Sequence, residues 1–158
     1  MKKGIIAVAS SVLGAVIGVG VTVQKFSVKT KKFQGYADKH LAMVRLMSDW
    51  LRAKQENKSI ADYLKNQGYK NIAIYGMSYL GENLLYELLG SDINVIYGID
   101  KNADNIYSDI NILTPDQDLE EVDAVIVTAI TFFDEVAELL SDKLECPILS
   151  LEDIIYDL

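Results

Sequence analysis

Residues 71–82 read Asn71–Ile72–Ala73–Ile74–Tyr75–Gly76–Met77–Ser78–Tyr79–Leu80–Gly81–Glu82, and this stretch decides the fold. An apolar run of strand length stops at Gly76, and an amphipathic helical pattern begins at a second glycine, Gly81. A second strand-like run, residues 93–100, ends in Asp100, nineteen residues after Gly81. A strand, a glycine turn, a helix and a strand that ends in an acid predict the opening βαβ unit of a Rossmann-like fold.

The glycine turn is the first candidate binding site. Such a turn directs the free N–H groups of a helix N-terminus at one point, which attracts phosphate. The residues Gly76, Ser78 and Gly81 follow the Gly-x-Gly-x-x-Gly pattern except that Ser78 replaces the middle glycine. The alternative is a purely structural turn with Ser78 as N-cap. Asp100 either accepts hydrogen bonds from a ribose or is only a solvated acid at a strand end, and an acid there disfavours NADP.

The rest of the chain continues this alternation. We expect further strands at Ile110–Leu113, at Asp123–Ala129 and at Pro147–Leu149. Strands that alternate with helices predict an α/β domain, a small doubly wound parallel sheet of about five strands in the order 3-2-1-4-5. In that order the loop after the fourth strand, with Thr128 and Thr131, faces the glycine turn across the switch point. Thr128 therefore joins the candidate ligand-binding residues.

Short polar motifs predict where the other helices begin. Serine, threonine and proline favour the first positions of a helix, and glycine favours the position after its end. We expect helices to start at Ser59, Thr114–Gln117, Thr131 and Ser150, and Gly68 to follow the end of the first of these.

The N-terminus carries a run of twenty uncharged residues, 4–23, which is long enough to span a bilayer as a helix. A cleaved signal peptide is the alternative, but the run is longer than a usual signal-peptide core. Six basic residues follow the run within residues 24–45 and two precede it, which predicts a single-pass membrane protein with its C-terminal domain in the cytoplasm. The single cysteine, Cys146, fits a reducing compartment.

These features divide the chain into three parts: a membrane anchor with a basic segment (1–35), a helical stalk (36–67) and the Rossmann-like domain (68–158). In the stalk, Leu41, Val44, Ser48 and Leu51 recur at helical spacing, and Met47 and Trp50 widen this stripe. We expect the stripe to pack on the domain, with pairing to a second stalk as the alternative. Ser10, Gly14 and Gly18 on the membrane helix allow a homodimer there too.

Charge excludes one class of partner. Residues 71–158 hold nineteen acidic residues and only two basic ones, Lys101 and Lys143, so this region has a net charge of −17. Such a domain does not bind nucleic acid through its surface.

Several segments together carry a family resemblance. They are Ile72–Gly76 with Gly81, Gly98–Asn102, Thr114–Pro115, Val122–Thr128 and Ile148–Ile155. In these segments the chain resembles small Rossmann-like domains of bacterial surface-polysaccharide proteins, such as those that precede sugar acetyltransferases. The resemblance covers about residues 60–158 and implies binding of a nucleotide-sugar at Gly76, Ser78, Gly81 and Asp100.

These observations leave three functional hypotheses. The first is a membrane-anchored, non-catalytic domain that binds a nucleotide or nucleotide-sugar in cell-envelope polysaccharide assembly. The second is an NAD-binding sensor or reductase, and the third is a protein-interaction module without a ligand. No nucleophile has an identifiable base and no group of residues has metal-ligand spacing, which favours a non-catalytic role.

Overall fold

A computed structural model describes residues 35–158 of the chain. The predicted membrane helix, residues 4–23, and the basic segment after it lie outside the described residues. Among residues 35–158, no helix combines the length and the apolar character that crossing a bilayer requires. Residues 43–158 form one compact unit, and residues 35–42 belong to a separate one.

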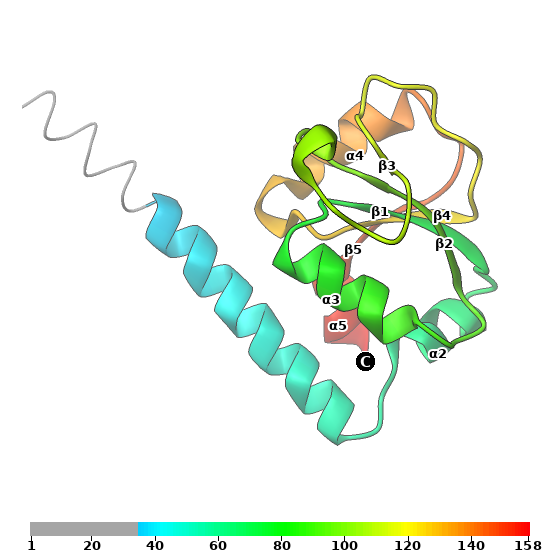
Figure 1. Cartoon of the computed structure of the whole chain (residues 1–158). Helices are drawn as coiled ribbons and strands as arrows, with labels where there is room; N and C mark the ends of the chain where they lie inside the picture. The colour runs from blue at the N-terminus through cyan, green and yellow to red at the C-terminus, as the bar shows by residue number, and fades with distance from the viewer. Residues whose placement is uncertain (1–34) are drawn as a thin grey trace, which may run out of the picture. The chain divides into compact units, whose positions relative to one another are not determined.

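The compact unit is built on a parallel sheet of five strands (Figure 1). The strands are β1 (Asn71–Tyr75), β2 (Asn94–Ile99), β3 (Ile112–Leu113), β4 (Ala124–Val127) and β5 (Ile148–Ser150). Their order is β3-β2-β1-β4-β5, which confirms the predicted topology. At the carboxyl edge Tyr75 pairs with Ile99 on one side and with Val127 on the other. In this order β4 lies beside β1 and not beside β3, so the strand order reverses between β1 and β4. Such a switch point is where α/β sheets bind ligands.

Helix α2 (Ile60–Asn66) precedes the sheet, α3 (Tyr79–Leu88) and α4 (Phe133–Ser141) connect strands, and α5 (Leu151–Asp157) follows the last one. The predicted serine caps are confirmed, because Ser59 accepts from the Asp62 N–H and Ser150 accepts from the Glu152 N–H. Gly68 follows α2 with a φ of +87°, a conformation that glycine adopts without strain.

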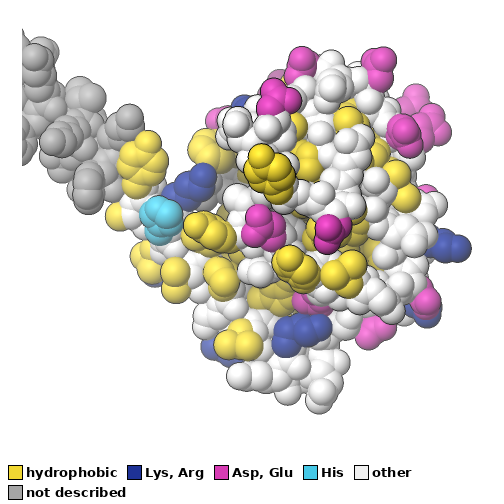
Figure 2. All heavy atoms as spheres, in the orientation of Figure 1, with side chains coloured by type: hydrophobic (Ala, Val, Ile, Leu, Met, Phe, Trp, Pro, Cys, Tyr) yellow, Lys and Arg dark blue, Asp and Glu magenta, His cyan; other side chains and the backbone are white. Residues whose placement is uncertain are grey.

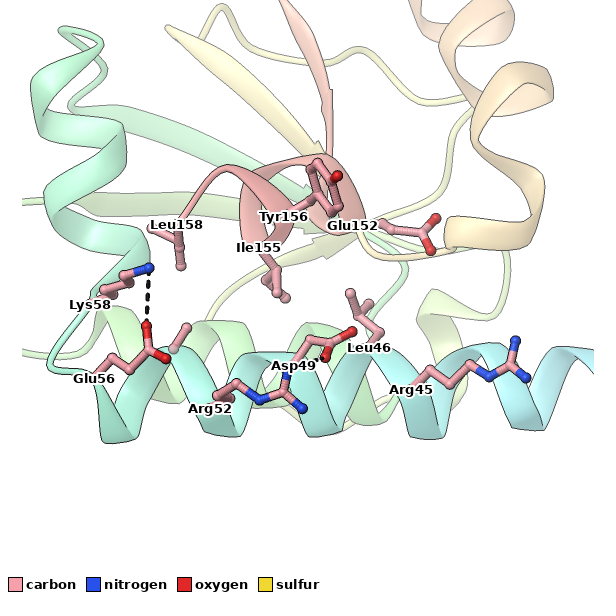
Figure 3. A pocket seen from close by; sticks show the side chains of 11 residues that line it. Arg45, Leu46, Asp49, Arg52, Glu56, Lys58, Glu152, Ile155, Tyr156 and Leu158 are labelled. Carbon is pink, nitrogen blue, oxygen red and sulfur yellow. Dashed lines mark ion pairs between the residues drawn. The ribbon is translucent and has the colours of Figure 1, made fainter.

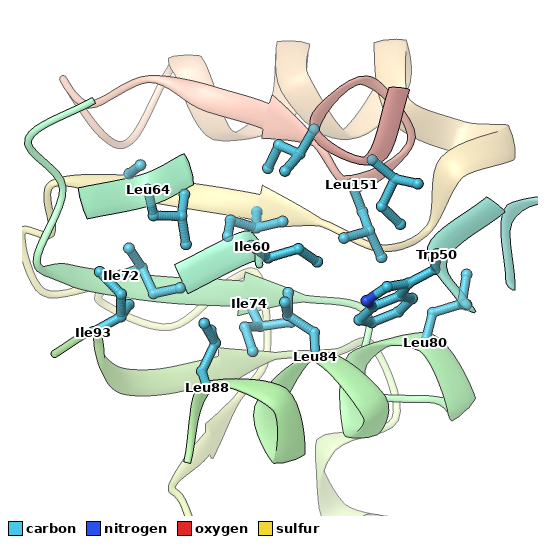
Figure 4. Packing of buried hydrophobic residues seen from close by; sticks show 14 of the residues in the cluster. Trp50, Ile60, Leu64, Ile72, Ile74, Leu80, Leu84, Leu88, Ile93 and Leu151 are labelled. Atoms are coloured by element: carbon cyan, nitrogen blue, oxygen red, sulfur yellow. The ribbon is translucent and has the colours of Figure 1, made fainter. Parts of the chain in front are cut away.

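Apolar side chains fill both faces of the sheet, as a doubly wound architecture requires. Residues of α2, α3 and α5 pack on one face, around Ile72, Ile74 and Ile126 (Figure 4). The opposite face is covered by α4, through Val136 and Leu140. The strand β4 is buried along its whole length, which explains its uninterrupted apolar sequence.

One predicted helix does not form. Residues 114–117 make a single turn, in which the Gln117 side chain accepts from the Thr114 N–H. The motif thus makes one of the two hydrogen bonds of a capping box, but the helix does not continue. Instead Leu119 and Val122 pack against the second face of the sheet, and their burial favours an extended path back to β4.

A long helix over residues 35–55 precedes α2. The prediction that Trp50 packs on the domain is confirmed, since Trp50 is buried in the same hydrophobic cluster as Ile74, Leu80 and Leu84 (Figure 4). The predicted stripe was otherwise wrong, because Leu41, Val44, Ser48 and Leu51 are exposed. The buried positions 46, 50 and 53 and the partly buried position 43 also recur at helical spacing, and the sequence does not distinguish the two faces.

Candidate functional site

The turn after β1 is held in a conformation that only glycine adopts easily. Gly76 has a φ of +93°, and its N–H donates to the Ile99 carbonyl over 2.8 Å. A Cβ atom at this position would lie 2.8 Å from Thr128 Oγ1 and 3.3 Å from the Ala129 nitrogen. The backbone of β1 therefore approaches β4 closely at the switch point, and any side chain at residue 76 would force them apart.

Asp100 holds the same turn from the side of β2. Its Oδ2 accepts from the Met77 N–H and its Oδ1 accepts from the Asn102 N–H, each over 2.9 Å. The acid predicted to bind a ribose thus has a structural task. A carboxylate accepts about four hydrogen bonds, so both oxygens retain capacity for a further donor.

Thr128 also supports the turn. It is buried, with 4% of its surface exposed, and its hydroxyl lies within hydrogen-bonding distance of the Tyr75 and Gly76 carbonyl oxygens. The side chain therefore fixes the backbone at the switch point and does not face solvent.

Gly81 allows α3 to start close to the strand. A Cβ atom there would lie only 2.2 Å from the Gly76 carbonyl oxygen, so no side chain fits. The five predicted site residues thus surround one turn: Gly76, Ser78, Gly81, Asp100 and Thr128.

Ser78 begins α3 without capping it. Its backbone is extended, as an N-cap requires, but its hydroxyl makes no capping hydrogen bond, and the residue is exposed. The first N–H groups of α3 therefore receive no acceptor from this side chain. Glu82 in the first turn contributes a negative charge near these N–H groups.

The helix on the other side of the switch point has the same property. We expected Thr131 to cap α4, and this prediction is wrong. A 3₁₀ turn, Ile130–Phe132, follows β4, the N-cap position is Phe132, and no side chain caps the helix. Thr131 is exposed within that turn.

The hydroxyl of Tyr75 was missed by sequence reasoning. It is buried and has no hydrogen-bond partner among residues 35–158. Burial raises the pKa of this phenol above its ordinary value, and the nearby Asp100 charge raises it further. A tyrosine as the last residue of a buried strand, just before a glycine turn, is the signal that could have revealed it.

Both basic residues of the region 71–158 line one pocket of about 320 Å³. Lys101 follows β2, and Lys143 lies just beyond α4, where its ammonium donates to the Pro115 carbonyl over 2.6 Å. Thr114 and Asp116, which follow β3, complete the polar lining. The two positive charges of residues 71–158 are therefore concentrated beside the ends of β2 and β3.

A second pocket, of about 420 Å³, lies between the long helix and α5 (Figure 3). Its charged side chains are largely paired: Arg52 lies 3.6 Å from Asp49, and Lys58 lies 3.1 Å from Glu56. Paired charges of both signs give this pocket no preference for an anion or a cation.

Within residues 35–158, no group of three or more His, Cys, Asp or Glu residues is arranged to hold a metal ion. No protein-family model matches the sequence, and no curated protein matches it.

Proposed function

We propose that this protein binds a nucleotide or nucleotide-sugar at the carboxyl edge of its sheet, between β1 and β4. The observation that carries the proposal is the pair of helix N-termini beside the switch point. Both α3 and α4 begin without a side-chain cap, whereas Ser59 caps α2 and Ser150 caps α5. Uncapped N–H groups at a helix N-terminus favour an anion such as a diphosphate.

The surroundings of the turn supply the other contacts. The free acceptor capacity of Asp100 suits a ribose hydroxyl, and Lys101 next to it lines a pocket together with Lys143. An unpartnered buried hydroxyl such as that of Tyr75 costs about 1–3 kcal/mol, so a polar ligand group that reached it would bind favourably.

The first turns of both helices also hold acids, namely Glu82 in α3 and Asp134 and Glu135 in α4. These carboxylates oppose a diphosphate that approaches alone. A Mg²⁺ ion bound to the diphosphate would offset the repulsion, so we expect binding to be stronger with Mg²⁺.

The cellular role proposed here is that of a non-catalytic accessory domain in cell-envelope polysaccharide assembly, anchored by residues 4–23 with the domain in the cytoplasm. It rests on the resemblance and on the charge bias around the uncharged run. A reporter enzyme fused after Leu158 should be active only if it is a cytoplasmic one. Activity of an extracytoplasmic reporter would contradict this topology.

The binding test is a thermal-shift panel on the purified full chain with UDP-sugars, NAD, ADP and coenzyme A, with and without Mg²⁺. A true ligand at a hundredfold excess over its Kd should add about 2.7 kcal/mol to the free energy of unfolding. A shift of the melting temperature with NAD and with no other compound would favour the redox hypothesis. If no compound shifts the melting temperature, the nucleotide-binding proposal fails and the protein-interaction module takes its place.

A single substitution locates the site. Ser78→Asp places a carboxylate where it caps α3 and where it repels a phosphate. We expect the variant to be at least as stable as the parent chain but to lose the ligand-induced shift. Ser59→Asp makes the same change at the start of α2 and should keep the shift; equal losses would place the ligand elsewhere.

A further inference from the structure

The outer side of α3 borders a groove that shares only Glu82 with the surroundings of the proposed nucleotide site. We call it the α3 groove; its lining comes from Glu82, Leu85, Tyr86 and Leu89 and from the loop at residues 107–110, and its volume is about 390 Å³. Leu85 and Ile110 are half-buried and pack on the core beneath. The groove thus has an apolar floor that is continuous with the hydrophobic core.

Large apolar side chains stand exposed at the rim. Tyr86 is 67% exposed, Leu89 is 64% exposed and Tyr107 is fully exposed. The inward side of the same helix is buried through Leu80, Leu84 and Leu88. Since α3 is apolar on two sides and only one of them is covered, its outer side has the character of an interface, where tyrosine is enriched.

The charge of the groove selects the partner. The groove contains two acids, Glu82 and Asp109, and no basic residue. Neither acid takes part in an ion pair within residues 35–158. On the face that carries α3, hydrophobic and acidic side chains lie interspersed (Figure 2). Nucleic acids and anionic lipid surfaces would be repelled there.

We propose that the α3 groove docks an arginine-bearing segment of a partner protein. A guanidinium group stacks on tyrosine rings and pairs with carboxylates in two-point geometry, and Tyr86, Tyr107, Glu82 and Asp109 offer both kinds of contact. Apolar side chains of the same segment would cover Leu85 and Leu89. Tyr86 and Glu82 lie four residues apart on one helix, so one arginine can meet both.

The test uses the purified full chain and a fluorescein-labelled amphipathic helical peptide whose polar face is arginine. Its twin carries glutamate at every arginine position. At physiological ionic strength, fluorescence anisotropy should show binding of the arginine peptide and none of the glutamate peptide. Tyr86→Ala and Glu82→Gln should each weaken binding by about tenfold, whereas Tyr86→Phe, which keeps the ring, should retain it.

Matched controls separate docking from general attraction to an acidic domain. Tyr156 on α5 is 90% exposed and Glu121 is exposed in the segment before β4. Tyr156→Ala and Glu121→Gln should leave the affinity within about twofold. Equal weakening by groove and control variants, equal binding of the two peptides, or no binding would overturn the proposal. So would a Tyr86→Ala variant that changes only the association state of the chain, because the groove would then serve a second copy.

Discussion

At the scale of single residues, the turn after β1 depends on atoms from three strands. Thr128 after β4 donates to the Tyr75 carbonyl, and Asp100 after β2 accepts from the Met77 N–H. Neither contact is local, since Thr128 is 53 residues from Tyr75. The shape of the candidate site is therefore a tertiary property, although the glycine that permits it is visible in the sequence.

The contribution of this close approach can be measured by Gly76→Ala. A non-glycine residue at positive φ costs about 1–2 kcal/mol, and the contact with Thr128 Oγ1 at 2.8 Å should add about 1–3 kcal/mol. Gly90→Ala is the matched control, because Gly90 has a φ of +77° and open space around it. Urea denaturation should show a larger decrease in the free energy of unfolding for Gly76→Ala than for Gly90→Ala. Equal decreases would mean that the close approach of β1 and β4 does not add to the cost.

At the scale of elements, one buried acid joins residues 43–55 of the long helix to α3. Glu87 of α3 accepts from the Trp50 indole N–H over 2.5 Å and from the Ile60 N–H over 3.0 Å. Lys54 lies 3.1 Å from the same carboxylate, whose side chain is only 8% exposed. A buried carboxylate needs such partners, so Glu87 ties the long helix, the start of α2 and α3 together.

Truncation of the tryptophan tests this attachment. Trp50→Ala removes a buried aromatic ring and leaves Glu87 with one donor fewer, so the free energy of unfolding should fall by about 3–5 kcal/mol. Leu51→Ala changes the neighbouring residue, which is 59% exposed, and should cost less than about 0.5 kcal/mol. Chemical denaturation of both variants measures these free energies. Similar small decreases for the two would show that the contact of Trp50 with α3 contributes little to stability.

At the scale of the whole molecule, the two faces of the sheet are covered unequally. Within residues 35–158, helices α2, α3 and α5 with Trp50 cover one face, whereas α4 and the irregular segment before β4 cover the other. Tyr97 fastens that segment, because its hydroxyl donates to the Glu120 carbonyl over 2.6 Å. Burial raises the pKa of Tyr97 to about 12 from the ordinary value of 10.0.

This shift predicts how the molecule responds to alkali. Since the folded state favours the neutral phenol, its contribution to stability is complete below about pH 10 and is lost as the pH rises towards about 12. The melting temperature should fall across that window. In Tyr97→Phe, which has no proton to lose, this part of the decline should be absent, although the variant loses the hydrogen bond to Glu120. An unchanged alkaline decline would assign it to other groups.

The alternation of residues 71–150 was enough to predict a parallel sheet with the order 3-2-1-4-5, because glycine turns, serine caps and buried strands depend on local conformation and on burial. Ser59 and Ser150 cap as expected for the same reason. Other features depend on which surfaces pack together, and only the tertiary structure decided them. Thr114–Gln117 and Thr131 carry sound helix-start motifs, yet packing of Leu119 and the 3₁₀ turn after β4 took precedence.

The long helix shows the same division. Its sequence determined a helix with apolar residues on more than one side, whereas the docking of Trp50 onto Glu87 selected the buried side and left Val44 and Leu51 exposed. At the candidate site the sequence determined which residues gather at the switch point. The hydrogen bonds of Asp100 and Thr128 to the turn arise only when three strands lie side by side, because each bond joins segments that are distant along the chain.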